Sequence, residues 1–305
     1  MFNERYDELR IQAAKLTASK ESLYEVAKQF RILGETKNPD DPVESSYVAL
    51  AKYGEMCCYK RLNQQSKVAS LSISIARLYL KTAEYYYQVS KNIHDSWGDY
   101  LSNSFQSYKT AIDIYKNENQ GSIASLLLIE LGENEMKFEQ FHYAGQSFEE
   151  SVDIAITQKM PTIYVFGPMF KAVDAYCKGD RFDLAMELLD KVENKYRKNI
   201  DDEMKDSKNV KEQYNDMMIL RTILLLLKSD YSECIAFAND KLDENVAKLF
   251  GLLCETSQKY QVSKYDAFLS NAKSQRYFND LEISLLEMKL SIVSRCLEIS
   301  LSMTK

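Results

Sequence analysis

The sequence predicts an all-α protein, an α-solenoid of antiparallel helix pairs, and three observations support this fold class. The 305 residues include only 9 Gly and 4 Pro, too few turn residues for a protein of many short strands. Within several segments, apolar residues recur every three or four positions, as on one face of an α-helix. Small residues also recur at a long step along the chain, which indicates a repeated helix pair.

The clearest helix pair is predicted around Leu131–Val152, which reads LGENEMKFEQFHYAGQSFEESV. One stripe at helical spacing precedes the polar stretch Lys137–Gln140 and a second follows it: Leu128, Leu131, Gly132 and Met136, then Phe141, Ala144, Phe148 and Ser151. We expect the small residues Gly132 and Ala144 to let two helix axes approach closely, with phenylalanine rings filling the space beside them. This spacing is typical of a tetratricopeptide-type repeat.

Similar layouts occur upstream and downstream of this pair. Their residues are Leu101, Ser104, Tyr108 and Ala111, then Ala172, Tyr176, Phe182, Ala185 and Leu189, then Leu225, Tyr231, Cys234 and Ala238. The small residues Ser104, Ala144 and Ala185 follow one another at steps of about 40 residues, and Cys234 follows after a longer one, against 34 in the consensus repeat. We therefore expect a degenerate tetratricopeptide-like array with long helices.

One continuous array is expected over residues 1–305, because a solenoid grows by adding repeats and no Pro-, Gly- or Ser-rich linker interrupts the chain. Only Lys198–Gln213 is interpreted as a loop. Its low hydrophobicity and clustered charge predict that part of it is mobile.

Charge excludes one class of partner and indicates a possible surface for another. A net charge of −6 argues against a nucleic-acid binder, whose affinity comes mainly from lysine and arginine on phosphates. Seven carboxylates share a window in which the basic residue is Lys137: Glu130, Glu133, Glu135, Glu139, Glu149, Glu150 and Asp153. We expect an acidic surface there, as an ordinary solvated helix face or as a contact for a basic partner.

The cysteines and the apolar runs bear on the compartment. Six cysteines lie in apolar helical patterns without C-x2-C spacing, which predicts reduced, buried thiols and a cytoplasmic or nuclear protein: Cys57, Cys58, Cys177, Cys234, Cys254 and Cys296. No signal peptide and no transmembrane segment are expected. The longest apolar run, Met217–Leu227, contains Arg221 and is about half the length that crosses a bilayer, so it predicts a buried core helix.

Residues that could carry chemistry are few. His94 and His142 have no His or Cys at metal-ligand spacing, and the phosphate-binding and nucleophile-elbow motifs are absent. The adjacent carboxylates Asp201 and Asp202 fall in the expected loop, where solvent would keep their pKa values ordinary. We therefore expect no enzyme activity, no catalytic residue, no metal and no cofactor.

Aromatic residues are the remaining unusual feature, with 21 Tyr and 13 Phe. Tyr85, Tyr86 and Tyr87 are consecutive and Trp97 follows soon after. Successive helical residues point about 100° apart, so at least one of the three tyrosines should be exposed. These four residues are the predicted partner-binding residues, because tyrosine and tryptophan are favoured at interfaces. The alternative is that two of the tyrosines pack on a neighbouring helix and the third has no role.

Several segments, in this order, resemble the family of the forty-kilodalton huntingtin-associated protein. They are RYDELRIQAAKLTASKESLYEVAKQFRILGE, SISIARLYLKTAEYYY, LGENEMKFEQFHYAGQSFEESVDIA, VDAYCKGDRFDLAMELLDKV and ILRTILLLLKSD. The chain departs from the vertebrate members in lacking an Ala/Gly-rich N-terminal extension. It also has the charged segment Lys198–Gln213 where they carry a Pro-rich insertion.

The resemblance implies a non-enzymatic scaffold that docks between the HEAT-repeat domains of huntingtin and stabilises their arrangement. It further implies vesicle transport at early endosomes, with a small GTPase of early endosomes as a second partner. No single-residue motif defines the contact, so the resemblance assigns no site residues.

The alternative is a soluble NSF attachment-type adaptor in SNARE disassembly and vesicle fusion, a family of similar length, acidity and helix-pair architecture. Two features of that family are missing. The early loop reads NPDDPVESS rather than an apolar membrane-touching loop, and the chain ends SLSMTK rather than in a short acidic tail with leucine. An enzyme built on a helical repeat is the third possibility, with no motif in its favour.

Overall fold

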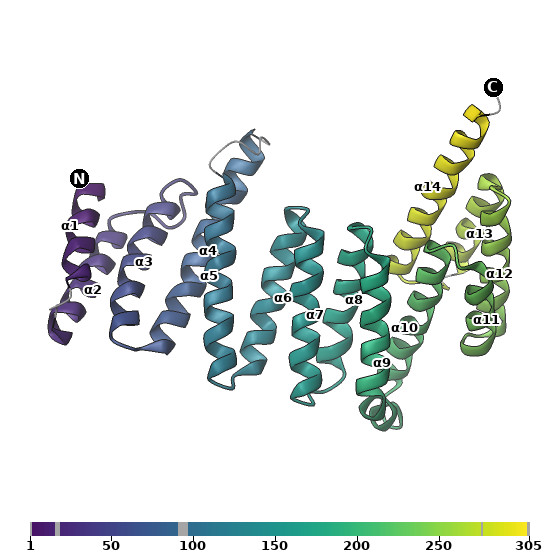
Figure 1. Cartoon of the computed structure of the whole chain (residues 1–305), viewed down its shortest axis with the longest axis horizontal. Coiled ribbons are helices and arrows are strands. Elements are labelled where there is room, and N and C mark those ends of the chain that lie inside the picture. Colours follow the sequence, from purple (N-terminus) through teal and green to yellow (C-terminus); the bar gives the residue numbers. More distant parts are fainter. Residues whose placement is uncertain (1, 16–18, 91–96, 276, 304–305) are drawn as a thin grey trace. The chain divides into compact units, whose positions relative to one another are not determined.

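The computed structural model describes residues 2–15, 19–90, 97–275 and 277–303, and the regular elements within these residues are α-helices (Figure 1). The prediction of an all-α protein is confirmed. The helices are α1 (Phe2–Ala14), α2 (Lys20–Glu35), α3 (Ser45–Arg61), α4 (Gln65–Ser90), α5 (Trp97–Asn117), α6 (Gly121–Lys137), α7 (Phe141–Thr157), α8 (Ile163–Lys178), α9 (Phe182–Met204), α10 (Lys208–Leu227), α11 (Tyr231–Lys241), α12 (Glu244–Gln258), α13 (Val262–Gln275) and α14 (Asp280–Met303).

The chain divides into two compact units, Met1–Leu131 and Gly132–Lys305, and the boundary falls inside α6. In the first unit, each helix from α1 to α5 packs on the next one. In the second unit the same holds from α7 to α14, and α14 also packs on α10. Packing of successive helices confirms the solenoid-like arrangement. A single array over all 305 residues stays a prediction.

The helix pair predicted around the polar stretch at 137–140 is present, since α6 ends at Lys137 and α7 begins at Phe141. A Cβ added to Gly132 would lie 2.7 Å from the ring of Phe148, so the two helices pack as closely as a glycine allows. Phe148 is 1% exposed and Ala144 is fully buried. The predicted close contact of Gly132 with Phe148 is confirmed, and Ala144 is buried as expected, while Phe141 is only half-buried.

The recurring small residues also lie where the repeat predicts. Ser104, Ala144, Ala185 and Cys234 belong to α5, α7, α9 and α11, and each of them is fully buried. The spacing in the sequence therefore corresponds to a buried small residue in every second helix from α5 to α11.

Seven of the turns between helices share one geometry. Each contains a non-glycine residue with φ between 51° and 66°: Asn63, Asn119, Glu139, Lys159, Asp180, Ser229 and Tyr260. The following N–H reaches back to the carbonyl five residues earlier, as from Gln140 to Glu135 at 2.9 Å. This is the Schellman motif, which satisfies carbonyl groups at the end of a helix. The motif usually has glycine at the left-handed position, and here it has none.

The prediction of a loop at Lys198–Gln213 is wrong. Helix α9 continues to Met204 and α10 begins at Lys208, so only 205–207 lie between helices. Ile200 and Val210 are buried on these helices. The charges that suggested a loop form ion pairs along the helix surface, such as Lys205–Asp202 and Lys208–Glu212. Ser207 accepts a hydrogen bond from the N–H of Val210 and caps α10.

The run Met217–Leu227 lies in α10 and is buried except at Arg221, so its interpretation as a core helix is confirmed. Arg221 is half-buried and forms ion pairs with Asp190 at 2.7 Å and Glu193 at 2.9 Å, both on α9. Within the described residues, none of the helices has the length and apolar character needed to span a membrane.

Candidate protein-binding surfaces

The predicted aromatic residues fall in one helix pair, α4 and α5. Tyr86 stacks on Tyr100 with a centroid separation of 6.0 Å and an interplanar angle of 12°, and Tyr100 stacks on Tyr79 at 6.0 Å and 27°. Tyr85 meets the edge of Tyr86 at 5.3 Å and is 39% exposed. We call these four tyrosines, 79, 85, 86 and 100, the tyrosine cluster.

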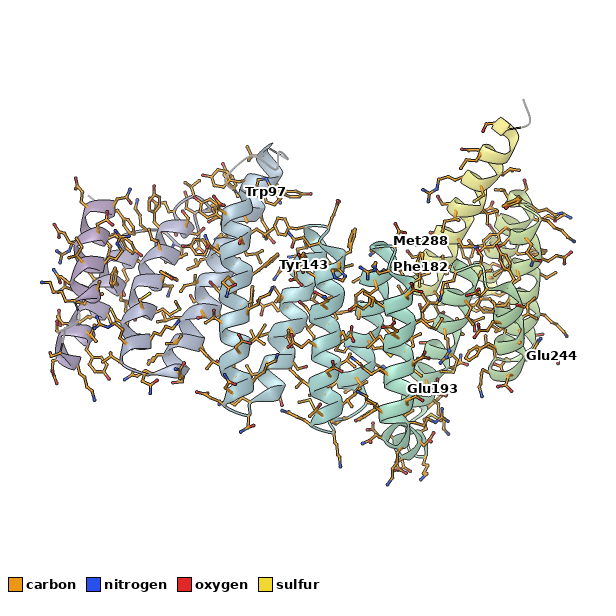
Figure 2. All side chains as sticks on the ribbon, viewed as in Figure 1. Trp97, Tyr143, Phe182, Glu193, Glu244 and Met288 are labelled. Atoms are coloured by element: carbon orange, nitrogen blue, oxygen red, sulfur yellow. The ribbon has the colours of Figure 1, made fainter. Side chains whose placement is uncertain are left out.

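The other three predicted partner-binding residues, Tyr86, Tyr87 and Trp97, are less exposed than Tyr85. Trp97 is the first residue of α5 (Figure 2), is 9% exposed and meets Tyr87 at 5.2 Å in a T-shaped arrangement. Tyr86 and Tyr87 are half-buried. The expectation of an exposed tyrosine is confirmed at Tyr85. Contact of any of the four predicted residues with a partner stays a prediction.

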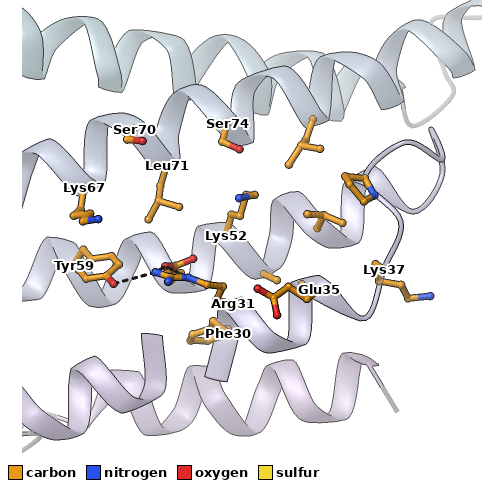
Figure 3. Close-up of a pocket in the computed structure, with 16 residues that line it drawn as sticks. Phe30, Arg31, Glu35, Lys37, Lys52, Tyr59, Lys67, Ser70, Leu71 and Ser74 are labelled. Atoms are coloured by element: carbon orange, nitrogen blue, oxygen red, sulfur yellow. Dashed lines mark hydrogen bonds and ion pairs between the residues drawn. The ribbon is translucent and has the colours of Figure 1, made fainter. Parts of the chain in front are cut away.

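A groove with a volume of about 680 Å³ lies on the first unit (Figure 3). Side chains from α2, α3 and α4 line it. Helices α2 and α4, which flank α3 here, are not consecutive in the chain. Its apolar lining includes Leu71 and Leu78 of α4, and its polar lining includes four cations and two carboxylates: Arg31, Lys37, Lys52, Lys67, Glu35 and Glu55.

Glu55 is the buried charge of this groove, at 2% exposed. Arg31 of α2 donates to Glu55 Oε1 from Nη2 at 2.5 Å and from Nε at 3.1 Å, and to the hydroxyl of Tyr59 at 3.4 Å. Hydrogen bonding and the negative charge of Glu55 raise the pKa of Arg31. The buried carboxylate is thereby neutralised, because an unpaired charge at such a site is strongly unfavourable.

The other cations of the groove differ in their partners. Lys37 pairs with Glu44 at 2.7 Å. Lys52 and Lys67 have no hydrogen bond or ion pair within the described part of the chain. Figure 3 shows Lys67, Ser70 and Ser74 on one helix and Lys52 on its neighbour, around the same space. The groove therefore carries positive charge that its own carboxylates leave uncompensated.

Sequence reasoning missed this groove. Lys52, Glu55 and Tyr59 are spaced three and four residues apart, which places them on one face of α3. That spacing is a weak signal, because the groove exists only where α2 and α4 flank this face.

The acidic surface expected between Glu130 and Asp153 is wrong for most of its residues. Arg77 of α4 donates two hydrogen bonds to the carboxylate of Glu130, from Nε at 2.7 Å and from Nη2 at 2.8 Å. This contact lowers the pKa of Glu130. Lys171 of α8 forms an ion pair with Glu133. A window of sequence could not show these cations, because they come from neighbouring helices.

The carboxylates of α7 are neutralised in the same way. Lys191 of α9 lies 2.5 Å from Glu149 and 3.0 Å from Asp153. On α6, Glu135 is 2% exposed and accepts a hydrogen bond from Ser147 of α7 at 2.7 Å, so it is an internal residue. The carboxylates therefore stabilise contacts between helices instead of forming a continuous acidic face.

The thiols follow the prediction in part. All six are free, and four are buried, but Cys57 is half-buried and Cys296 is exposed. Cys296 lies near the end of α14, in a stretch where most side chains are exposed. Its predicted burial is wrong. Burial raises the pKa of Cys57, and it raises that of Cys58 to about 11.

We expect iodoacetamide to modify Cys296 first, Cys57 more slowly and the other four thiols only after unfolding, because reaction requires an accessible thiolate. Mass spectrometry of tryptic peptides measures the order. In Cys296→Ser the fast step should disappear while the slower steps keep their rates. Fast modification of Cys177 in the native chain would contradict the packing of α8.

The part of the chain that the structure describes offers no candidate metal site. Groups of three or more His, Cys, Asp or Glu able to hold a metal are absent there. His142 is half-buried on α7, with its ring 6.5 Å from that of Tyr176. His94, the other histidine, lies outside the described residues.

Comparison with known proteins provides no family assignment. A scan against protein-family models finds no match to this chain, and a search of curated proteins finds no significant relative.

Proposed function

We propose that this protein is a non-catalytic scaffold that binds a large HEAT-repeat protein of the huntingtin type and stabilises its conformation. The observation that carries the proposal is a pair of surface features built across successive helices: the groove of α2, α3 and α4, and the tyrosine cluster on α4 and α5. Helical repeat proteins bind macromolecules through such extended surfaces. The order of the segments that resemble the huntingtin-associated family supports this choice of partner.

Exposed apolar side chains are available in both units. Val89 and Leu126 of the first unit are 66% and 59% exposed, and Tyr143 of the second unit, labelled in Figure 2, is 55% exposed. Single exposed apolar residues are common on any protein surface, so they do not define a site by themselves. They are the kind of side chain that a large partner would cover, and an interface above about 2,000 Å² is expected for a permanent complex.

Affinity purification of the tagged full-length chain from native cytosol tests the proposal. A very large HEAT-repeat protein should be recovered in stoichiometric amount. It should remain bound in about 1 M salt, because buried apolar contacts are not screened. Recovery of the fusion ATPase and SNARE proteins in its place would contradict the proposal and support an attachment-type adaptor. The same resemblance suggests a small GTPase of early endosomes as a second partner and a role in early-endosome transport. Mass spectrometry of the same purified sample would show whether such a GTPase is bound.

A pair of variants tests whether the tyrosine cluster belongs to the interface. We expect Tyr85→Ser to reduce recovery of the partner, because it removes the exposed ring of the cluster. Tyr164→Ser is the matched control, since Tyr164 is 45% exposed at the start of α8. Equal recovery with both variants would remove the cluster from the interface.

A further inference from the structure

The first unit carries a line of hydrogen-bond donors that the scaffold proposal does not explain. On α4, the residues Lys67, Ser70, Ser74, Arg77 and Lys81 follow one another at steps of three and four, so they form one stripe along the helix. We call these five residues the donor stripe. None of them carries negative charge. They line two hollows, the groove described above and a neighbouring one, and the two share Pro39, Ser70, Ser74 and Leu78.

The donor stripe is occupied at one end and open at the other. Arg77 is held by Glu130, and Lys81 donates to the carbonyl of Pro39 at 3.0 Å and forms an ion pair with Asp40 at 3.5 Å. Lys67 has no partner among the described side chains, and Lys52 lines the same groove from α3 without one. The open end therefore combines two uncompensated ammonium groups with the hydroxyls of Ser70 and Ser74.

This positive charge is local, because the whole chain carries −6. In the groove, Glu55 is buried against Arg31, and Glu35 is the remaining carboxylate of the lining. A groove with unpaired cations attracts an anion, and complementary charge raises both the rate and the specificity of association.

We infer that the open end of the donor stripe, Lys67, Ser70 and Ser74, binds together with Lys52 an extended acidic segment, rich in aspartate and glutamate, of a partner protein. This end spans seven helical steps, or about 10 Å at 1.5 Å per residue. An extended chain of about three residues covers that length. Carboxylates at alternate positions of such a segment would face the donors, and the leucines of the groove would contact its aliphatic side chains.

A nucleic acid fits these features less well. Its affinity requires many phosphate contacts, and the uncompensated cations of this groove are two. The inference rests on the proposed function in supplying the chemistry of one partner contact, but its test uses a peptide and no large partner. A failure here would leave the scaffold proposal standing.

Fluorescence anisotropy with the full-length chain and a labelled glutamate-rich peptide tests the inference. We expect saturable binding that weakens as salt rises, and no binding of the peptide in which glutamine replaces glutamate. Lys52→Glu and Lys67→Glu should each weaken binding by about five- to tenfold. Lys109→Glu on α5 is the matched control for charge, because Lys109 is exposed and does not line the groove.

A change in the opposite direction guards against misfolded variants. Glu35→Gln removes the carboxylate of the lining that Arg31 does not hold and should strengthen binding by about twofold or more. Asp113→Asn, an exposed change on α5, should leave binding unchanged. The inference would be overturned if Lys109→Glu weakened binding as much as Lys52→Glu. It would also be overturned by absence of binding, or by an oligonucleotide of equal charge competing as well as the peptide.

Discussion

Replacing Gly145 with alanine is expected to lower the free energy of unfolding by about 2–3 kcal/mol. A Cβ at this position would lie 2.4 Å from the ring of Tyr176, far inside normal contact. That ring cannot move away easily, because Tyr176 is 1% exposed and its hydroxyl donates to Glu149 at 2.7 Å. The added methyl group must therefore separate α7 from α8. Urea denaturation followed by circular dichroism measures the change.

Gly167→Ala is the matched control in the same unit. Gly167 lies inside α8, and a Cβ there would meet no atom within 4 Å. Alanine has the higher helix propensity, so this variant should be more stable by about 0.4–1 kcal/mol. Similar stability of the two variants would show that α7 and α8 are not packed as closely as the structure indicates.

Replacing Glu282 with glutamine is expected to raise the stability above neutral pH by about 2–4 kcal/mol. Glu282 is 1% exposed at the start of α14. Its Oε2 accepts from the N–H of Asn279 at 2.9 Å, while Oε1 has no partner among the described residues. Burial, and secondarily the charge of Asp216 on α10, raise the pKa of Glu282 from 4.5 to about 8. Glutamine resembles the neutral form and retains the acceptor.

The sign of the pH dependence follows from proton binding. Between pH 4.5 and about 8 the native state binds more protons at Glu282 than the unfolded state does, so the parent loses stability as pH rises. The advantage of Glu282→Gln should be absent near pH 4.5 and complete above about 8. Thermal melts across this range measure it. Glu298→Gln, an exposed change on the same helix, should give no such trend, and a constant offset for Glu282→Gln would mean that Glu282 is ionised throughout.

The parts of the fold predicted correctly from sequence depend on local spacing. The helix pair at α6 and α7 could be read from Gly132, Ala144 and Phe148, because residues three or four apart share a helix face and small residues mark close contacts. The same reasoning placed the run Met217–Leu227 in the core.

The wrong predictions concern charge, whose role depends on neighbours distant in sequence. Lys198–Gln213 has the composition of a loop, but its charges pair along two helices and Ile200 is buried. Lys52 and Lys67 could not be recognised as a site, because they come together only where α3 and α4 border one groove. Glu282 has an ordinary place in a helical pattern, and only packing of α14 on α10 shows that it is buried.

The seven turns without glycine affect how the chain folds. A residue other than glycine has fewer conformations in the unfolded chain, so ordering each turn costs less backbone entropy than ordering a glycine turn. Each of these turns also joins two helices that are adjacent in sequence, so their contacts close short loops. Low sequence separation of contacts favours rapid folding. Helix pairs such as α6 with α7 can therefore form early, as the segments emerge during synthesis, and the later helices can add onto a surface that is already ordered.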